Sequence, residues 1–245
     1  MTMYIEEYIY FLIGLAVCAL FSAYASYKVT STFRAYSGVR CLSGMTGYDT
    51  ATKLLWAADA REITVGKVRG TLTDHYHPTK GVVNLSESTY GSASVGAVAV
   101  AAHEVGHVAQ KKRGYLPYKV RTALVPVVNI GSRLAVPLVI IGMVLDLFSL
   151  SANPTTGFTV ALVGVCLYGA ATLFQLVTLP VEYNASRRAK KMLREQGILT
   201  DEELRGADKV LDAAALTYVA ALATSLLYFL RFLLWVLAVF GRRRR

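Results

Sequence analysis

Cysteine is scarce in this sequence of 245 residues, which contains only Cys18, Cys41 and Cys166. No two of them form a CxxC pair, so the sequence gives no sign of a disulfide framework or of a zinc site built from cysteine. Two lie inside apolar runs and the third stands alone. We interpret all three as small buried hydrophobic side chains.

Acidic residues are also few, with 16 aspartates and glutamates against 26 lysines and arginines, for a formal net charge of +10. Hydrophobic residues make up 54% of the chain, above the range of about 45–50% that is usual in soluble proteins. The basic residues lie mostly beside hydrophobic segments. They therefore indicate orientation in a lipid bilayer and contact with anionic headgroups, and no nucleic-acid partner is expected.

The N-terminus lacks the basic segment of a signal peptide and carries Glu6 and Glu7 instead. We therefore interpret residues 9–27 as a retained membrane span. Residues 134–150 and 158–179 predict two more spans, joined by an uncharged turn at 149–157.

Basic residues predict the orientation of these spans. Residues 28–121 hold thirteen lysines and arginines and residues 180–209 hold seven, whereas residues 149–157 hold none. Both basic segments are therefore expected in the cytoplasm. Residues 213–240 are apolar apart from Arg231, and four arginines follow. We expect this segment to divide near Arg231 and to leave the basic tail inside, although a continuous spanning helix is the alternative.

The polar segment after the first span shows a mixture of helical and strand patterns. Leucines and alanines at helical spacing predict a helix over 48–60 with Thr46 as a possible cap. Residues 62–72 and 82–85 are typical of strands, with a turn at 77–81 between them. Residues 92–110 are small and apolar on all sides before His103, which predicts a helix buried in a core.

The buried helix carries the motif His103-Glu104-Val105-Gly106-His107. Residues four apart share one helical face, so both imidazoles can reach one metal ion. The intervening glutamate can take a proton from a water that zinc activates. Gly106 removes a side chain where a substrate or the chain must come close. An ordinary surface helix with two histidines is the alternative, but this helix is mostly apolar, and burial of these side chains is costly without a partner.

A catalytic zinc site needs a third ligand and an open position. No H-x-x-G-x-x-H pattern follows the motif, so a carboxylate on a later helix is expected, and Glu182 is the best candidate. Pro180 can start a new helix there. The alternative is that Glu182 is a helix N-terminal glutamate favoured by the helix dipole.

Several longer segments resemble the YugP-like membrane zinc metallopeptidases and, more distantly, the HtpX-like gluzincins. They cover most of the chain: Gly70–Tyr76 (GTLTDHY), Val83–Ser86 (VNLS), Ala101–His107 (AAHEVGH), Gln175–Pro180 (QLVTLP), Val181–Ala189 (VEYNASRRA) and Ala213–Ala220 (AAALTYVA). The resemblance implies that His103, His107 and Glu182 bind zinc and that Glu104 is the general base. HtpX-like proteins usually carry an acidic residue where this chain has Ser186; a hydroxyl there can still accept the histidine N–H.

The expected fold is a mainly helical, membrane-anchored α+β fold with three to four transmembrane helices and a minimal gluzincin-like unit. Its predicted parts are an N-terminal transmembrane helix (1–28), the first part of the catalytic domain (29–122), a transmembrane hairpin (123–179), a helix with the third zinc ligand (180–212) and an apolar helix with a basic tail (213–245).

The sequence thus predicts a multi-pass cell-membrane endopeptidase with one Zn²⁺, cleaving peptide or membrane-protein substrates at the cytoplasmic face. Two alternatives stay open. An intramembrane site-cleaving protease needs the motif inside a span and an aspartate ligand, for which Asp146 and Asp212 lack the usual glycine neighbour. A non-enzymatic scaffold needs a fourth protein ligand to its structural zinc, such as His75.

Less specific signals surround this site. The Asp74-His75-Tyr76 segment is expected either to donate to the oxyanion or line the cleft, or to form a turn that satisfies its own backbone. Residues 82–86 are either an edge strand to which a peptide adds or an ordinary strand. Arg187 and Arg188 bind a substrate carboxylate or remain solvated.

Overall fold

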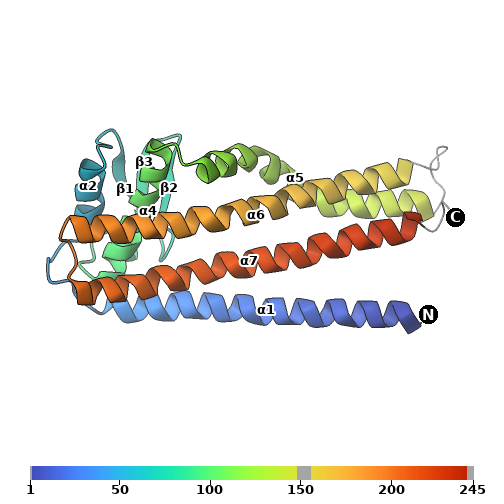
Figure 1. The fold of residues 1–245 in the computed structure, drawn as a ribbon, viewed down its shortest axis with the longest axis horizontal. Coiled ribbons are helices and arrows are strands. Elements are labelled where there is room, and N and C mark those ends of the chain that lie inside the picture. The colour runs from blue at the N-terminus through green and yellow to red at the C-terminus, as the bar shows by residue number, and fades with distance from the viewer. Residues whose placement is uncertain (1, 148–155, 242–245) are drawn as a thin grey trace. The chain divides into compact units, whose positions relative to one another are not determined.

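The computed structural model describes residues 2–147 and 156–241 (Figure 1). The chain is mainly helical with one small sheet, as the sequence predicts. It forms two compact units. The helical unit comprises Met1–Ser22, Val120–Thr178 and Tyr218–Arg245, and the mixed unit comprises Ala23–Lys119 and Leu179–Thr217. The predicted basic tail and nearly all of the turn at 149–157 lie outside the described residues.

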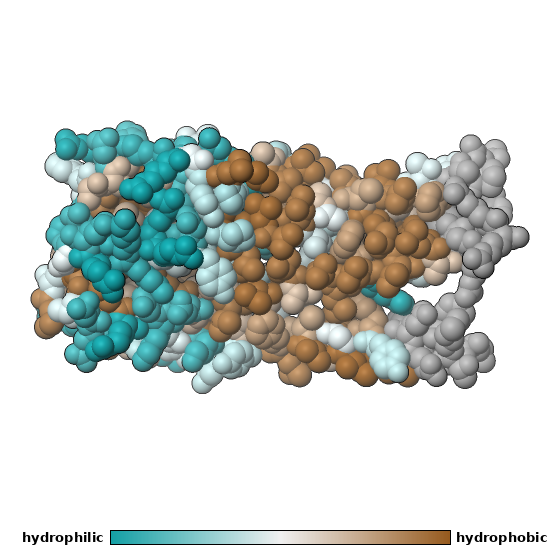
Figure 2. Space-filling model, viewed as in Figure 1, coloured by the Kyte–Doolittle hydropathy of each residue, from teal (hydrophilic) through white to brown (hydrophobic). Residues whose placement is uncertain are grey.

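Four helices of the described residues are long and apolar enough to cross a membrane. Large apolar side chains such as Leu20, Ile130 and Leu176 are exposed on them, and Figure 2 shows the hydrophobic surface that such side chains form. In water this surface would be unfavourable, whereas lipid tails solvate it. The four helices are α1 (Thr2–Ser37), α5 (Leu116–Leu147), α6 (Thr156–Glu195) and α7 (Asp201–Gly241).

Small residues bring α5 and α6 together inside the helical unit. A Cβ atom on Gly142 would lie 2.4 Å from the backbone nitrogen of Ala161, and one on Gly164 would lie 2.6 Å from the carbonyl oxygen of Ala135. Close backbone approach at glycine and alanine is how helices gain dispersion energy in lipid, where the hydrophobic effect contributes little.

Two predicted interruptions of these helices are wrong. Pro180 does not start a new helix but lies inside α6, and α7 continues through Arg231 without the expected division. An internal proline costs about 3 kcal/mol, but Val181 and Leu193 beyond it are fully buried and hold the same helix in place. Arg231 lies over the Phe11 ring at 5.2 Å from its centroid, a contact that stabilises a cation in an apolar setting.

The mixed unit contains a three-stranded sheet with the order β1–β3–β2. β3 pairs in parallel with β1 and antiparallel with β2, so it is the central strand. Of the two interpretations of residues 82–86, the ordinary sheet strand is therefore confirmed and the edge strand is excluded, because the short segment 75–77 pairs beside them. The strands are β1 (Thr64–Val68), β2 (His75–His77) and β3 (Val82–Ser86).

Helices pack around this sheet to form the core of the mixed unit. Thr46 caps α2 (Gly47–Ala57) in a reciprocal capping box with Asp49, as its sequence position indicates. The short α3 (Glu87–Tyr90) leads into α4 (Val95–Lys112), which is buried along most of its length, as predicted. α4 contacts both α2 and β2, so its histidines are held within a packed core.

Candidate metal centre

Helix α4 presents His103 and His107 on one face. Ser94 caps the N-terminus of this helix, and its hydroxyl accepts a hydrogen bond from the Ala97 N–H. Its small apolar residues allow close packing on all sides. The two imidazole rings lie edge to face with their centroids 4.8 Å apart, as residues four apart on a helix should. The predicted buried helix therefore delivers both rings to one point.

Helix α6 brings Glu182 to the same point. Val181, Ala185 and Ala189 recur every four residues and are fully buried, which fixes this face of α6 against the core. Gly106 permits the approach of α4, since a Cβ atom there would lie 2.5 Å from the Ala185 carbonyl oxygen. Glu182 lies inside α6 rather than at its start. A favourable interaction with the dipole at a helix N-terminus therefore does not explain why a glutamate occupies this position.

The three side chains converge on a common space. Glu182 Oε2 lies 3.1 Å from His103 Nε2 and 3.5 Å from His107 Nε2. One ligand atom from each residue lies within 4.8 Å of the others, and the described residues contain no second such group. Glu182 is only 2% exposed. Two imidazole nitrogens and one carboxylate oxygen are a donor set that suits zinc.

The Nδ1 atoms of both imidazole rings, which face away from Glu182, also have hydrogen-bond partners. His103 Nδ1 lies 3.1 Å from the Ser186 hydroxyl, one turn beyond Glu182 on α6. His107 Nδ1 lies 3.0 Å from the side-chain oxygen of Gln110. Both rings are thus anchored through Nδ1 and turn Nε2 toward Glu182, the arrangement by which outer partners orient metal-binding histidines.

Glu104 lies beside this group and is 8% exposed. Burial raises the pKa of its carboxyl to about 7, and Glu182 and Asp74 add to this effect. The positive field of His103 and a hydrogen bond from the Tyr76 backbone N–H oppose the rise in pKa. A carboxyl poised near neutral pH is suited to accept and return a proton.

Two other candidates near the site have structural partners. Both carboxylate oxygens of Asp74 accept hydrogen bonds from Ser86, one from its N–H at 2.7 Å and one from its hydroxyl at 2.8 Å. His75 Nδ1 lies 2.9 Å from the Thr73 carbonyl oxygen, and its Nε2 lies 3.1 Å from the Asn84 amide nitrogen. The segment is therefore not the turn that was the alternative interpretation, because His75 and Tyr76 belong to strand β2 and Asp74 is paired with β3.

The structure does not support an aspartate ligand of the kind that an intramembrane protease needs. Asp212 accepts a hydrogen bond from Lys190 Nζ at 3.3 Å. An intramembrane site requires the motif inside a span, and α4 is not among the four helices of the described residues that are long and apolar enough to cross a membrane. The side chain of Asp146 lies outside the described residues.

Gln110 is a contributor that sequence reasoning missed. It lies three residues after His107 and therefore shares its helical face. Its amide nitrogen donates to the Val181 carbonyl oxygen and to Asn184 Oδ1. Arg188, predicted to meet substrate or solvent, donates to that same Asn184 oxygen. The spacing of Gln110 from the motif was the available signal.

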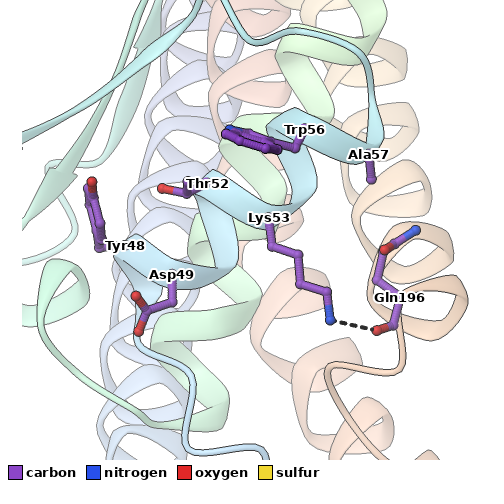
Figure 3. A pocket seen from close by; sticks show the side chains of 7 residues that line it. All are labelled: Tyr48, Asp49, Thr52, Lys53, Trp56, Ala57 and Gln196. Carbon is purple, nitrogen blue, oxygen red and sulfur yellow. Dashed lines mark hydrogen bonds between the residues drawn. The ribbon is translucent and has the colours of Figure 1, made fainter.

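An open groove elsewhere in the mixed unit is separate from these residues. It has a volume of 410 Å³, and Lys53 Nζ donates across it to the Gln196 carbonyl oxygen (Figure 3). It carries no pair of histidines, so it is not the metal centre. Its lining residues are Tyr48, Asp49, Thr52, Lys53, Trp56, Ala57 and Gln196.

Comparison with known proteins agrees with this donor set. Residues 10–237 match the family model described as "Putative neutral zinc metallopeptidase". This chain belongs to that family. It is also 44% identical over 223 residues to the "Putative membrane protease YugP" of Bacillus subtilis (strain 168). The aligned residues cover 91% of this chain and 95% of the relative. No solved structure matches.

The zinc metallopeptidase family accounts for the resemblance seen in the sequence motifs. The three predicted ligands are brought together and can hold a metal ion. Their binding of zinc and the role of Glu104 as base stay predictions. The four apolar helices and the membrane protease relative identify a membrane protein.

Proposed function

We propose that this protein is a membrane-bound, zinc-dependent endopeptidase that hydrolyses peptide bonds. The observation that carries the proposal is the convergence of His103, His107 and Glu182 within 4.8 Å in a buried setting. One Zn²⁺ held by these residues would polarise a carbonyl and lower the pKa of water to about 7.

Glu104 is the general base in this proposal. Its carboxylate takes the proton of the attacking water and passes it to the leaving amine. The Tyr76 backbone N–H donates a hydrogen bond toward this carboxylate. Because Tyr76 belongs to the edge strand β2, an extended peptide or a segment of a membrane protein that adds to this edge would lie beside Glu104.

The test is the Glu104→Gln variant of the full chain, purified in detergent. We expect it to keep stoichiometric zinc and to lose casein cleavage, because an amide cannot take the proton. Glu195→Gln is the matched control, since Glu195 has an exposed side chain that pairs with Lys191 at the surface, and it should retain activity that a chelator abolishes. Full activity of Glu104→Gln with bound zinc would refute the mechanism.

The active site is proposed to face the cytoplasm. Residues 28–121 and 180–209, which adjoin the first three spans on the proposed cytoplasmic side, hold thirteen and seven basic residues. This excess of basic residues supports the assignment. Because α7 is unbroken at Arg231, a fourth crossing would deliver residues 242–245 outside, despite their four arginines.

A single cysteine placed after Arg245, in a variant without Cys18, Cys41 and Cys166, tests this topology. We expect an impermeant maleimide to label it in intact cells. A cysteine replacing Trp56, which is 61% exposed on α2, should react only after lysis. Protection of the tail cysteine in intact cells would reject the fourth crossing, and labelling of residue 56 in intact cells would reject the cytoplasmic site.

A further inference from the structure

Gln110 is a fully buried amide one helical turn from His107. A primary amide has two N–H donors and an acceptor oxygen, and burying them without partners costs free energy. Its hydrogen-bond partners His107, Val181 and Asn184 lie in the mixed unit, on α4 and α6. The amide is therefore a fixed part of this core rather than a mobile surface group.

The partners of Gln110 decide which way its amide faces. Its Nε2 lies 2.7 Å from the Val181 carbonyl oxygen, which can only accept a hydrogen bond. It also lies 3.0 Å from Asn184 Oδ1. That atom is identified as the oxygen because Arg188 Nε, which can only donate, lies 2.7 Å from it. The amide nitrogen must then face α6, and the amide oxygen must face His107.

This orientation selects one tautomer of His107. The amide oxygen of Gln110, 3.0 Å from Nδ1, accepts only, so Nδ1 must carry a hydrogen. In a neutral imidazole the other nitrogen then has a free lone pair. That nitrogen, Nε2, is the one that faces Glu182 at 3.5 Å. The buried network thus prepares His107 to bind a metal through Nε2.

His103 lacks an equivalent constraint. The Ser186 hydroxyl beside its Nδ1 can donate or accept. A hydroxyl adapts to either tautomer, whereas an amide fixed by two acceptors does not. The two histidines are therefore held by partners of different selectivity.

We propose that Gln110 is a positioning residue that, with Asn184 and Arg188, holds His107 with Nδ1 protonated and Nε2 directed at the metal. The inference rests on the proposed zinc site. Loss of such outer partners typically weakens metal binding by about 10–100-fold, and we expect that range for Gln110→Met, which keeps the side-chain length without the amide. Asn184→Ala should cause a smaller loss, because Val181 still orients the amide.

The first experiment measures the zinc dissociation constant of the full chain by competition with a chromogenic chelator. Gln196→Met is the matched control, because Gln196 lies in the same unit and its side chain lines the separate groove (Figure 3). The control should bind zinc as the unaltered chain does. Binding by Gln110→Met within threefold of the unaltered chain would overturn the inference while leaving the proposed function intact.

A second measurement covers the case in which Gln110→Met does not fold. The chain has four histidines, so ¹⁵N-histidine labelling of the unaltered, zinc-loaded protein gives a spectrum that single histidine variants assign. We expect His107 to show a slowly exchanging Nδ1 proton and a metal bond at Nε2. An Nδ1 without a proton would overturn the inference. Zinc binding without peptide cleavage by the unaltered chain would instead refute the proposed function alone.

Discussion

The two units of this chain are stabilised in different ways. The mixed unit buries a continuous apolar core that runs from α2 through α4 to the ends of α6 and α7, and it encloses polar side chains that are paired with one another. In the helical unit the buried cluster is small, with Val139, Ala161, Val165 and Val236 at its centre. Its helices leave large apolar side chains on the outside.

The difference follows from the solvent that each unit meets. Water drives apolar burial and makes unpaired buried polar groups costly, so the mixed unit shows a dense core in which the polar side chains around the candidate metal centre are paired. Lipid supplies no such drive, so close contact at small residues holds α5 and α6 together. A substitution should therefore have consequences that depend on the unit in which it lies.

The largest expected effect is loss of the metal centre. Glu182→Ala removes one of the three proposed ligands and should weaken zinc binding by orders of magnitude, measured as zinc content after gel filtration. The helical unit contains no part of the site, so helical content by circular dichroism should persist. Glu195→Ala, on the exposed end of α6, is the control. Undiminished zinc in Glu182→Ala would mean that this carboxylate is not a ligand.

The centre was predictable because its signals are local. The spacing of His103 and His107 and the absence of a later histidine motif point to a carboxylate, and the geometry brings Glu182 to both rings. Gln110 was missed because its three-residue spacing from His107 places it on the same helical face but does not show what its amide contacts. Its role depends on acceptors from α6, about 70 residues away in sequence.

The errors in the fold have the same origin. Pro180 and Arg231 are local signals for helix ends, but packing on either side of each residue outweighs them. The three residues of β2 are too few to give an alternating pattern, so the central position of β3 was not visible. Long-range pairing decides such features, and local propensity does not.

An intermediate effect is expected from a matched pair of glycine substitutions. A Cβ atom at Gly106 would lie 2.5 Å from the Ala185 carbonyl oxygen, and one at Gly164 would lie 2.6 Å from that of Ala135. Both clash with backbone, so each alanine variant should lose about 1–3 kcal/mol of stability. Gly106→Ala should also bind zinc more weakly because it separates α4 from α6.

Thermal unfolding and zinc titration distinguish the two variants. Gly164→Ala should unfold at a lower temperature yet bind zinc normally below that temperature. Gly91→Ala, where a Cβ atom would meet nothing within 4 Å, is the control for the substitution itself. Equal zinc loss in Gly106→Ala and Gly164→Ala would contradict the separation of the two units.

The smallest effect is expected at Ser186, which tests how much the anchor of His103 contributes. Ser186→Ala removes the hydroxyl that lies 3.1 Å from His103 Nδ1, and outer partners contribute about 10–100-fold to metal affinity. A hydroxyl is a weaker acceptor than a carboxylate and does not fix the tautomer, so the loss should lie near tenfold and below that of Gln110→Met. Ser186→Asp places a carboxylate at this position. A carboxylate accepts the Nδ1 hydrogen more strongly, so this variant should bind zinc at least as tightly as the unaltered chain. Zinc titrations of both variants decide the matter: if Ser186→Ala loses more affinity than Gln110→Met, the hydroxyl rather than the buried amide is the dominant anchor of the centre.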